Sequence, residues 1–226
     1  MLWDVDYTLL NAAGLGNQLY ETVFRDLFRR ELTAIAPKAG RTDRAILLDT
    51  LTLAGVAEPR AHVDDFLAAL AREVAAVDGS AQAYVRALPG AAAAIAAVAA
   101  TGARQSVLTG NIRPLAELKL AAAGLGEHLD LDIGAYGDVH EVRAELVPVA
   151  RQAAQATYGA DFGGAATVLV GDTPLDVEAA LATEARAVAV ATGSFGAADL
   201  LAAGAHVVVP DLTDTPRVLA AVTAHP

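Results

Sequence analysis

The sequence has no cysteine, one methionine, one tryptophan and few aromatic residues of any kind. The absence of cysteine excludes a disulfide framework. Long apolar runs are missing too. The longest stretch without a charged residue, 87–103, is broken by proline and glycine and falls short of the ~20 apolar residues of a membrane span. No basic region followed by an apolar stretch opens the chain, so we expect a cytoplasmic protein with neither secretory signal nor transmembrane helix.

Basic residues are also scarce. The 226-residue chain carries 16 Lys and Arg against 27 Asp and Glu, which gives a net charge of −11 and a pI near 4.7. Nucleic acids and anionic membranes bind clusters of Lys and Arg, so we expect neither as a partner. A small anion still fits a site that is locally positive.

The sequence alternates short apolar strands with helical patterns. Hydrophobic residues make up 54% of the chain, and many are alanine, which favours helix without adding much apolar bulk. Apolar runs predict strands at the start of the chain and at residues 105–108, 129–137, 166–170, 186–193 and 206–210. This alternation predicts an α/β fold, a doubly wound, Rossmann-like parallel sheet that binds ligands at the carboxyl ends of its strands.

Residues 14–84 interrupt this alternation, because they show helical periodicity and no strong strand. Three helical stretches are separated by Gly, Pro or polar breaks: LYETVFRDLFRREL, TDRAILLDTLTLAG and VDDFLAALAREVAAV. We therefore predict a helical insertion at 14–84 within an α/β core made of residues 1–13 and 85–226.

Polar side chains follow three of the predicted strands. Asp4 and Asp6 follow the first, Thr109 follows the strand at 105–108, and Asp172 comes shortly after 166–170. Any one of them alone is more often a cap of the next helix. The carboxyl ends of parallel strands lie at one edge of a sheet, so their recurrence predicts a shared site there.

The motifs DVDYT, LTGN and GDTPLD, in this order and at strand ends, resemble those of the haloacid dehalogenase-type hydrolase superfamily. The resemblance covers nearly the whole chain. The 14–84 segment is similar to the helical cap of phosphoglycolate-phosphatase-like members. Asp6 implies phosphoryl transfer, since the dehalogenase branch carries no aspartate at this position.

Four carboxylates, those of Asp4, Asp6, Asp172 and Asp176, would repel one another in one crevice unless a cation is present. Hard oxygen ligands and phosphate chemistry favour Mg²⁺. The resemblance implies that Asp4 and Asp172 bind the ion by their side chains and Asp6 by its backbone carbonyl. Asp176 is then expected to hold a metal-bound water.

The same resemblance implies the chemistry. Asp4 would be the nucleophile that forms an aspartyl-phosphate, and Asp6 the general acid and base. In extended backbone, residues i and i+2 point to the same side, so both carboxylates reach one substrate. Thr8 is expected to orient Asp6 or to fix the turn. Tyr7, where the family commonly has glycine, is expected to pack under the cap.

The phosphoryl oxygens are expected to contact Thr109 and the backbone amides of Gly110 and Asn111. A cation is also required, and the sequence offers two. We predict Arg143, where the family usually has lysine, because a guanidinium binds phosphate in a bidentate manner. Lys119 is the alternative, although a solvated helix face is the favoured interpretation of this residue.

The insertion is expected to set substrate choice. Arg41, Thr42 and Asp43 lie in GRTDRAIL, which is similar to the cap segment that faces the active site, so they are candidates for leaving-group contacts. Thr42 or Asp43 is equally a candidate helix N-cap. Gly14 and Gly16 are expected to act as hinges.

We therefore expect a Mg²⁺-dependent phosphatase of phosphoglycolate-phosphatase-like type, monomeric or homodimeric, that acts on a small phosphorylated metabolite. The alternatives are a sugar phosphomutase of the same superfamily and a non-catalytic phosphate- or metal-binding regulator. Only three residues precede Asp4, which is short for a central strand. Either the strand is short or the natural chain begins upstream, and we expect the latter.

Overall fold

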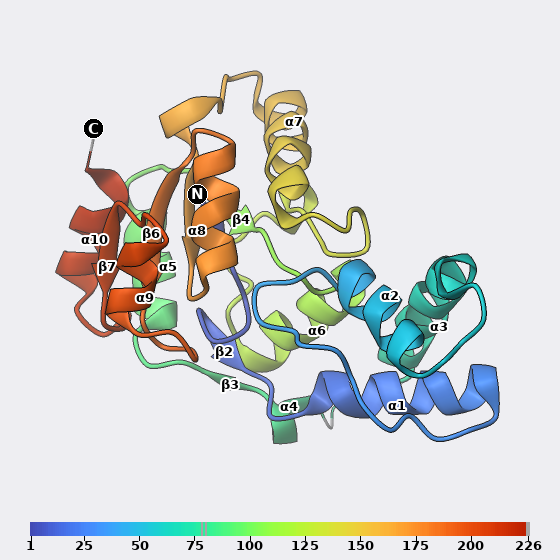
Figure 1. Ribbon diagram of the computed structural model, residues 1–226. Helices are drawn as coiled ribbons and strands as arrows, with labels where there is room; N and C mark the ends of the chain where they lie inside the picture. The colour runs from blue at the N-terminus through green and yellow to red at the C-terminus, as the bar shows by residue number, and fades with distance from the viewer. Residues whose placement is uncertain (78, 80, 225–226) are drawn as a thin grey trace.

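The computed structural model describes residues 1–77, 79 and 81–224; residues 78 and 80 of the predicted insertion and 225–226 of the predicted core lie outside the described part. The main sheet has five parallel strands in the order β4-β1-β5-β6-β7 (Figure 1). The strands are β1 Leu2–Trp3, β4 Ser106–Val107, β5 Val168–Gly171, β6 Arg186–Val190 and β7 Val207–Val209. This sheet confirms the predicted parallel α/β fold.

Helices cover both faces of the sheet. Successive residues of a strand point to opposite sides, so each strand contributes side chains to both layers. Trp3 and Val170 belong to one hydrophobic core, while their neighbours Leu2 and Leu169 belong to the other. The first core also contains residues of α5 Ala91–Ala99, α6 Arg113–Ala123 and α10 Thr215–Thr223. The second contains residues of α7 Leu146–Tyr158, α8 Pro174–Ala182 and α9 Ala197–Ala202. The fold is therefore doubly wound, as predicted.

The strand predicted at 129–137 is wrong. This stretch holds a 3-10 helix at Leu131–Ile133 and a single bridge between Leu108 and Ala135. The reason is local, because the Asp130 side chain accepts a hydrogen bond from the Asp132 amide and turns the backbone where a strand would continue.

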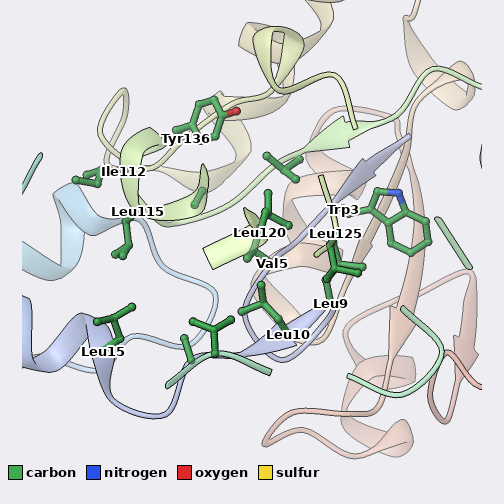
Figure 2. Packing of buried hydrophobic residues seen from close by; sticks show 14 of the residues in the cluster. Trp3, Val5, Leu9, Leu10, Leu15, Ile112, Leu115, Leu120, Leu125 and Tyr136 are labelled. Atoms are coloured by element: carbon green, nitrogen blue, oxygen red, sulfur yellow. The ribbon is translucent and has the colours of Figure 1, made fainter. Parts of the chain in front are cut away.

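Strand β1 is short but paired on both sides. Leu2 and Trp3 lie opposite residues of β4 on one side and of β5 on the other. The chain then turns, and the Leu9 and Leu10 amides both donate to the Val5 carbonyl. Figure 2 shows the buried side chains of this turn beside those of α6. The backbone around Asp4 is thus fixed from three directions.

The predicted insertion is helical. It contains α1 Leu15–Phe28, α2 Asp43–Leu53, a 3-10 helix Pro59–His62, α3 Val63–Ala76 and α4 Ala81–Tyr84. The chain leaves and returns through a two-stranded antiparallel sheet, β2 Leu10–Asn11 and β3 Arg86–Ala87. In Figure 1, α1, α2 and α3 group to one side of the main sheet. The division into cap and core stays a prediction.

Among the described residues, no helix is both long enough and apolar enough to cross a membrane.

Candidate active site

A pocket of about 210 Å³ lies beyond the carboxyl ends of β1, β4 and β5. Its walls come from the loops after these strands and from the helical segment. Among the predicted site residues, those that line it are Asp4, Asp6, Arg41, Asp43, Thr109, Gly110, Asn111, Lys119, Arg143 and Asp172. Thr42 and Asp176 are buried close by rather than on the pocket wall.

Three buried carboxylates meet at the floor of the site. Asp4, Asp172 and Asp176 each offer an oxygen, and these oxygens lie within 4.8 Å of one another. Burial raises the pKa of Asp4 to about 7, although Arg143 opposes the rise. Burial, Asp4 and Asp176 together raise the pKa of Asp172 to about 8. Without a further cation, this cluster therefore resists full ionisation at neutral pH.

Arg143 lies inside this cluster. It belongs to the 3-10 helix Arg143–Glu145 before α7, and its Nη2 lies 2.6 Å from Asp4 Oδ1 and 2.6 Å from Asp176 Oδ1. Burial opposes the charge of the guanidinium, but Asp176 and Asp4 raise the pKa of Arg143 above its ordinary value. The predicted cation is thus in the site, paired with the predicted nucleophile. One guanidinium against three carboxylates leaves the cluster negative.

The donor set fits a hard divalent cation. Asp176 Oδ2 caps α8, where it accepts hydrogen bonds from the Thr173 amide at 3.0 Å and the Thr173 hydroxyl at 2.7 Å. Its other oxygen, Oδ1, is buried and pairs with Arg143 by charge, but accepts no hydrogen bond among the described residues. Asp176 is therefore both a helix cap and a site residue. Buried oxygens with a net negative charge match the ligands that Mg²⁺ prefers.

Thr8, expected to orient Asp6 or to fix the turn, and Gly193, for which no role was predicted, both position Asp172. Thr8 Oγ1 donates to Asp172 Oδ1 at 3.3 Å, so Thr8 bonds Asp172 rather than Asp6. A Cβ on Gly193 would lie 1.8 Å from Asp172 Oδ2, so only glycine leaves this carboxylate where it is. The available signal was the position of Gly193 at the end of the strand predicted at 186–193, at the same edge of the sheet as the other site residues.

The solvated face predicted for Lys119 is wrong. This residue is 4% exposed, and its ammonium lies 2.8 and 2.7 Å from the two carboxylate oxygens of Asp6. Lys119 follows Leu115 by four residues and Ala116 by three, so it shares their buried face of α6. The hydrophobic neighbours indicated a buried face, and the pocket beside it accommodates the ammonium.

Asn111 connects Asp6 with Thr109. Its Nδ2 lies 2.6 Å from Asp6 Oδ2 and 2.8 Å from Thr109 Oγ1, and its Oδ1 accepts from Lys119 at 2.7 Å. Burial would raise the pKa of Asp6, but the ammonium of Lys119 and the bond from Asn111 outweigh it and lower this pKa. Asp6 is therefore held ionised. This side-chain role of Asn111 was not predicted.

Two of the three predicted leaving-group residues, Thr42 and Asp43, connect the helical segment to loops of the predicted core. Thr42 caps α2 by accepting from the Ala45 amide at 3.2 Å, and its hydroxyl donates to the Glu141 carbonyl at 3.0 Å. The Asp43 amide donates to the Gly110 carbonyl at 2.6 Å. The Asp43 carboxylate accepts from the Ile112 amide at 2.8 Å and from the Tyr20 hydroxyl at 2.7 Å.

Two further pocket residues differ in their contacts. Arg41 pairs with Asp49 at 2.7 Å within its own segment. Tyr7 was expected to pack under the cap, but its side chain is 50% exposed and lines the pocket. Its φ of 60° lies in the left-handed region, which suits the glycine that the family commonly has at this position.

Comparison with known proteins supplies the family. A family model described as haloacid dehalogenase-like hydrolase matches residues 1–181. No curated protein matches the chain. Among solved structures, a hydrolase from Pseudomonas syringae has a TM-score of 0.65 at 20% identity, covering 99% of this chain and 98% of that one.

Two other solved structures have a similar fold. A HAD family hydrolase from Deinococcus radiodurans R1 with bound phosphate and sodium has a TM-score of 0.55 at 24% identity, covering 98% of this chain and 94% of that chain. A protein from Lactobacillus delbrueckii assigned as a phosphoglycolate phosphatase has a TM-score of 0.63 at 13% identity, covering 99% and 98%. At such identities the likeness shows a shared fold. With most of its length matched by the family model, including the motifs at Asp4, Thr109 and Asp172, the chain belongs to the haloacid dehalogenase-like hydrolases.

Proposed function

We propose that this chain is a Mg²⁺-dependent phosphatase that hydrolyses a small phosphorylated metabolite through an aspartyl-phosphate intermediate. The observation that carries the proposal is the contact of Asp4 with Arg143 beside the buried carboxylates of Asp172 and Asp176. A nucleophilic carboxylate must be ionised, and here it adjoins one guanidinium and a donor set suited to a divalent cation.

Asp172 and Asp176 would hold the ion together with Asp4, and the family resemblance adds the backbone carbonyl of Asp6. When bound, Mg²⁺ neutralises charge on the phosphoryl group and favours the ionised form of Asp4. Arg143 keeps Asp4 Oδ1 fixed at 2.6 Å, which sets the direction of the carboxylate. The Asp4 carboxylate then attacks phosphorus, and the bond to the leaving oxygen breaks.

The loop after β4 would bind the phosphoryl oxygens. Thr109 Oγ1 accepts hydrogen bonds from the Asn111 amide at 3.3 Å and from Asn111 Nδ2 at 2.8 Å. Both bonds use its lone pairs, so its own hydrogen is left to donate to a phosphoryl oxygen. Gly110, which also lines the pocket, lets this loop pass close to the helical segment, because a Cβ there would lie 1.9 Å from the Arg41 carbonyl.

Asp6 would serve both proton transfers. The protonated form gives its proton to the leaving alkoxide, and the ionised form takes a proton from the water that hydrolyses the aspartyl-phosphate. Lys119 and Asn111 favour the ionised form, which suits the second step. The pocket of about 210 Å³ is smaller than typical pockets for drug-sized ligands, which supports a small substrate.

The test is phosphate release from a panel of phosphomonoesters with and without Mg²⁺. Asp4→Asn is expected to reduce release by about a thousandfold or more, because the nucleophile is lost. Asp26→Asn, the same change at an exposed position of α1, is the matched control and should retain activity. No release from any ester would contradict the proposal in favour of a binding regulator. Isomerisation of a sugar phosphate without release would contradict it in favour of a phosphomutase.

A further inference from the structure

The chain has only two lysines, Lys38 and Lys119, and both line the pocket. Lys38 belongs to the connection between α1 and α2, which runs back along α1 toward the sheet before α2 begins (Figure 1). Its ammonium therefore reaches the pocket from the helical segment, whereas the carboxylate cluster reaches it from the sheet edge.

Lys38 differs from the other basic residues of the pocket in its partners. Arg143 pairs with Asp4 and Asp176, Lys119 pairs with Asp6, and Arg41 pairs with Asp49. Among the described residues, no carboxylate lies within 4.0 Å of the Lys38 ammonium.

Neutral groups hold Lys38 instead. Its Nζ donates to Asn17 Oδ1 at 2.6 Å and lies 4.6 Å from the centre of the Tyr20 ring. Gly16 leaves the space beside the ammonium open, because a Cβ added at this position would lie in van der Waals contact with Nζ, at 3.7 Å. Amide and aromatic partners fix the position of a cation without neutralising its charge.

This arrangement is costly unless an anion enters the pocket. Burial lowers the pKa of Lys38, Asp43 opposes this, and Lys119 lowers the pKa further. A partly desolvated ammonium gains most from an anionic ligand that reaches it directly. The phosphoryl group itself is placed at the sheet edge, beside Asp4 and Thr109.

We propose that Lys38, with Asn17, forms a subsite for a second anionic group on the leaving group, so the substrate is a compact phosphomonoester that also carries a carboxylate or a second phosphate. The proposal rests on the proposed function, because it takes the phosphoryl group to lie at Asp4. Lys38 is then a specificity-determining residue, and the shape of the pocket limits the distance between the two anions.

The test uses non-hydrolysable phosphonates of similar length, so that binding is measured separately from turnover. Calorimetry in the presence of Mg²⁺ compares 3-phosphonopropionate, which ends in a carboxylate, with propylphosphonate, which ends in a methyl group. Ethane-1,2-diylbisphosphonate is the phosphate-like arm, and whichever of these two ligands binds more tightly identifies the second group. Wild type is expected to prefer the carboxylate or bisphosphonate over propylphosphonate by about tenfold or more.

Lys38→Met is expected to remove most of this preference. Lys38→Glu is expected to reverse it toward 3-aminopropylphosphonate, a gain that a misfolded variant could not produce. Arg30→Met is the matched control: Arg30 lies in the same connection and its guanidinium is 5.4 Å from the Phe24 ring centre, but it does not line the pocket. It should keep the wild-type preference, which separates a local contact from a change in net charge.

The outcomes separate the two proposals. A wild type without the preference, or a Lys38→Met variant that keeps it, overturns the subsite even if phosphomonoesters are hydrolysed. A preference that depends on Lys38 supports the subsite even if no ester is hydrolysed, and in that case the proposed function fails alone.

Discussion

Lys119 positions Asp6 by a double contact to its carboxylate oxygens. Such a contact fixes the direction in which Asp6 can pass or accept a proton. The residue acts through Asp6 and does not need to touch the substrate, so it is a positioning residue of the proposed reaction.

Replacement of Lys119 by Met is expected to lower kcat by about 10–100-fold, because the acid and base loses its orientation. KM for a simple alkyl phosphate should change far less, since the phosphoryl contacts remain. Steady-state kinetics and a melting curve check this. Arg113→Met on the same helix is the control, because Arg113 is half-exposed and pairs with Glu117 and Asp132 at the surface. A Lys119→Met enzyme with the wild-type kcat would contradict the assignment.

The acidic residues of the site could be predicted from the sequence, since Asp4, Asp6 and Asp172 follow apolar runs that are readable one by one. Lys119 and Gly193 could not be assigned in this way. Their roles depend on which side chains approach them from distant parts of the chain: Asp6 approaches Lys119 from over a hundred residues away, and Asp172 fills the space that a side chain at position 193 would need. Local patterns carry no information on such approaches.

At the scale of elements, the N-terminus of α2 is the main polar contact between the helical segment and the loop after β4. The Asp43 amide donates a hydrogen bond to the Gly110 carbonyl. The buried Asp43 carboxylate accepts hydrogen bonds from the Ile112 amide and the Tyr20 hydroxyl. Burial raises the pKa of Asp43, while the bonds from Tyr20 and Ile112 lower it. The contact thus depends on complete hydrogen bonding of a buried carboxyl group.

Tyr20→Phe is expected to lower the free energy of unfolding by about 1–3 kcal/mol, because one oxygen of Asp43 loses its donor inside the protein. Urea denaturation measures the change. Tyr158→Phe is the comparison: it also removes a hydroxyl bond to an aspartate, Asp130, but near the surface, where water replaces the lost donor. Equal losses in the two variants would argue against a buried polar contact at Asp43.

The order and type of most elements followed from periodicity, because the strands of a sheet buried on both faces are continuous apolar runs. The failure at 129–137 has a physical cause. Asp130 makes a side-chain bond that competes with strand pairing, and hydrophobicity does not report such a bond. Residues 42 and 43 show the converse, since one short segment serves as both helix cap and contact to the core.

At the scale of the whole molecule, the carboxylate cluster links stability to pH and, through the proposed metal site, to Mg²⁺. The folded-state pKa values of Asp4 and Asp172 are raised to about 7 and about 8 from the ordinary aspartate value of 3.8. Between pH 3.8 and these raised pKa values, the metal-free folded protein holds more protons than the unfolded chain. The stability that these two groups contribute is therefore lost progressively as pH rises from about 4, and none of it remains above about 8.

In the proposed metal site Mg²⁺ would bind the ionised cluster, so its stabilising effect is expected to increase from pH 6 to pH 8.5. Thermal unfolding with EDTA and with saturating Mg²⁺ at both pH values gives the difference. Asp172→Asn should abolish most of the increase. A Mg²⁺ effect that is equal at both pH values, or larger at pH 6, would contradict a metal site built on these carboxylates.

The distribution of basic residues has a practical consequence. Reagents that acylate primary amines, such as dye esters, biotin esters and activated resins, find no lysine outside the pocket. Coupling through lysine is thus directed to the proposed substrate pocket, and a preparation immobilised in this way would be blocked at the site of the proposed reaction. A single introduced cysteine is the better handle, since the chain has none with which it could compete.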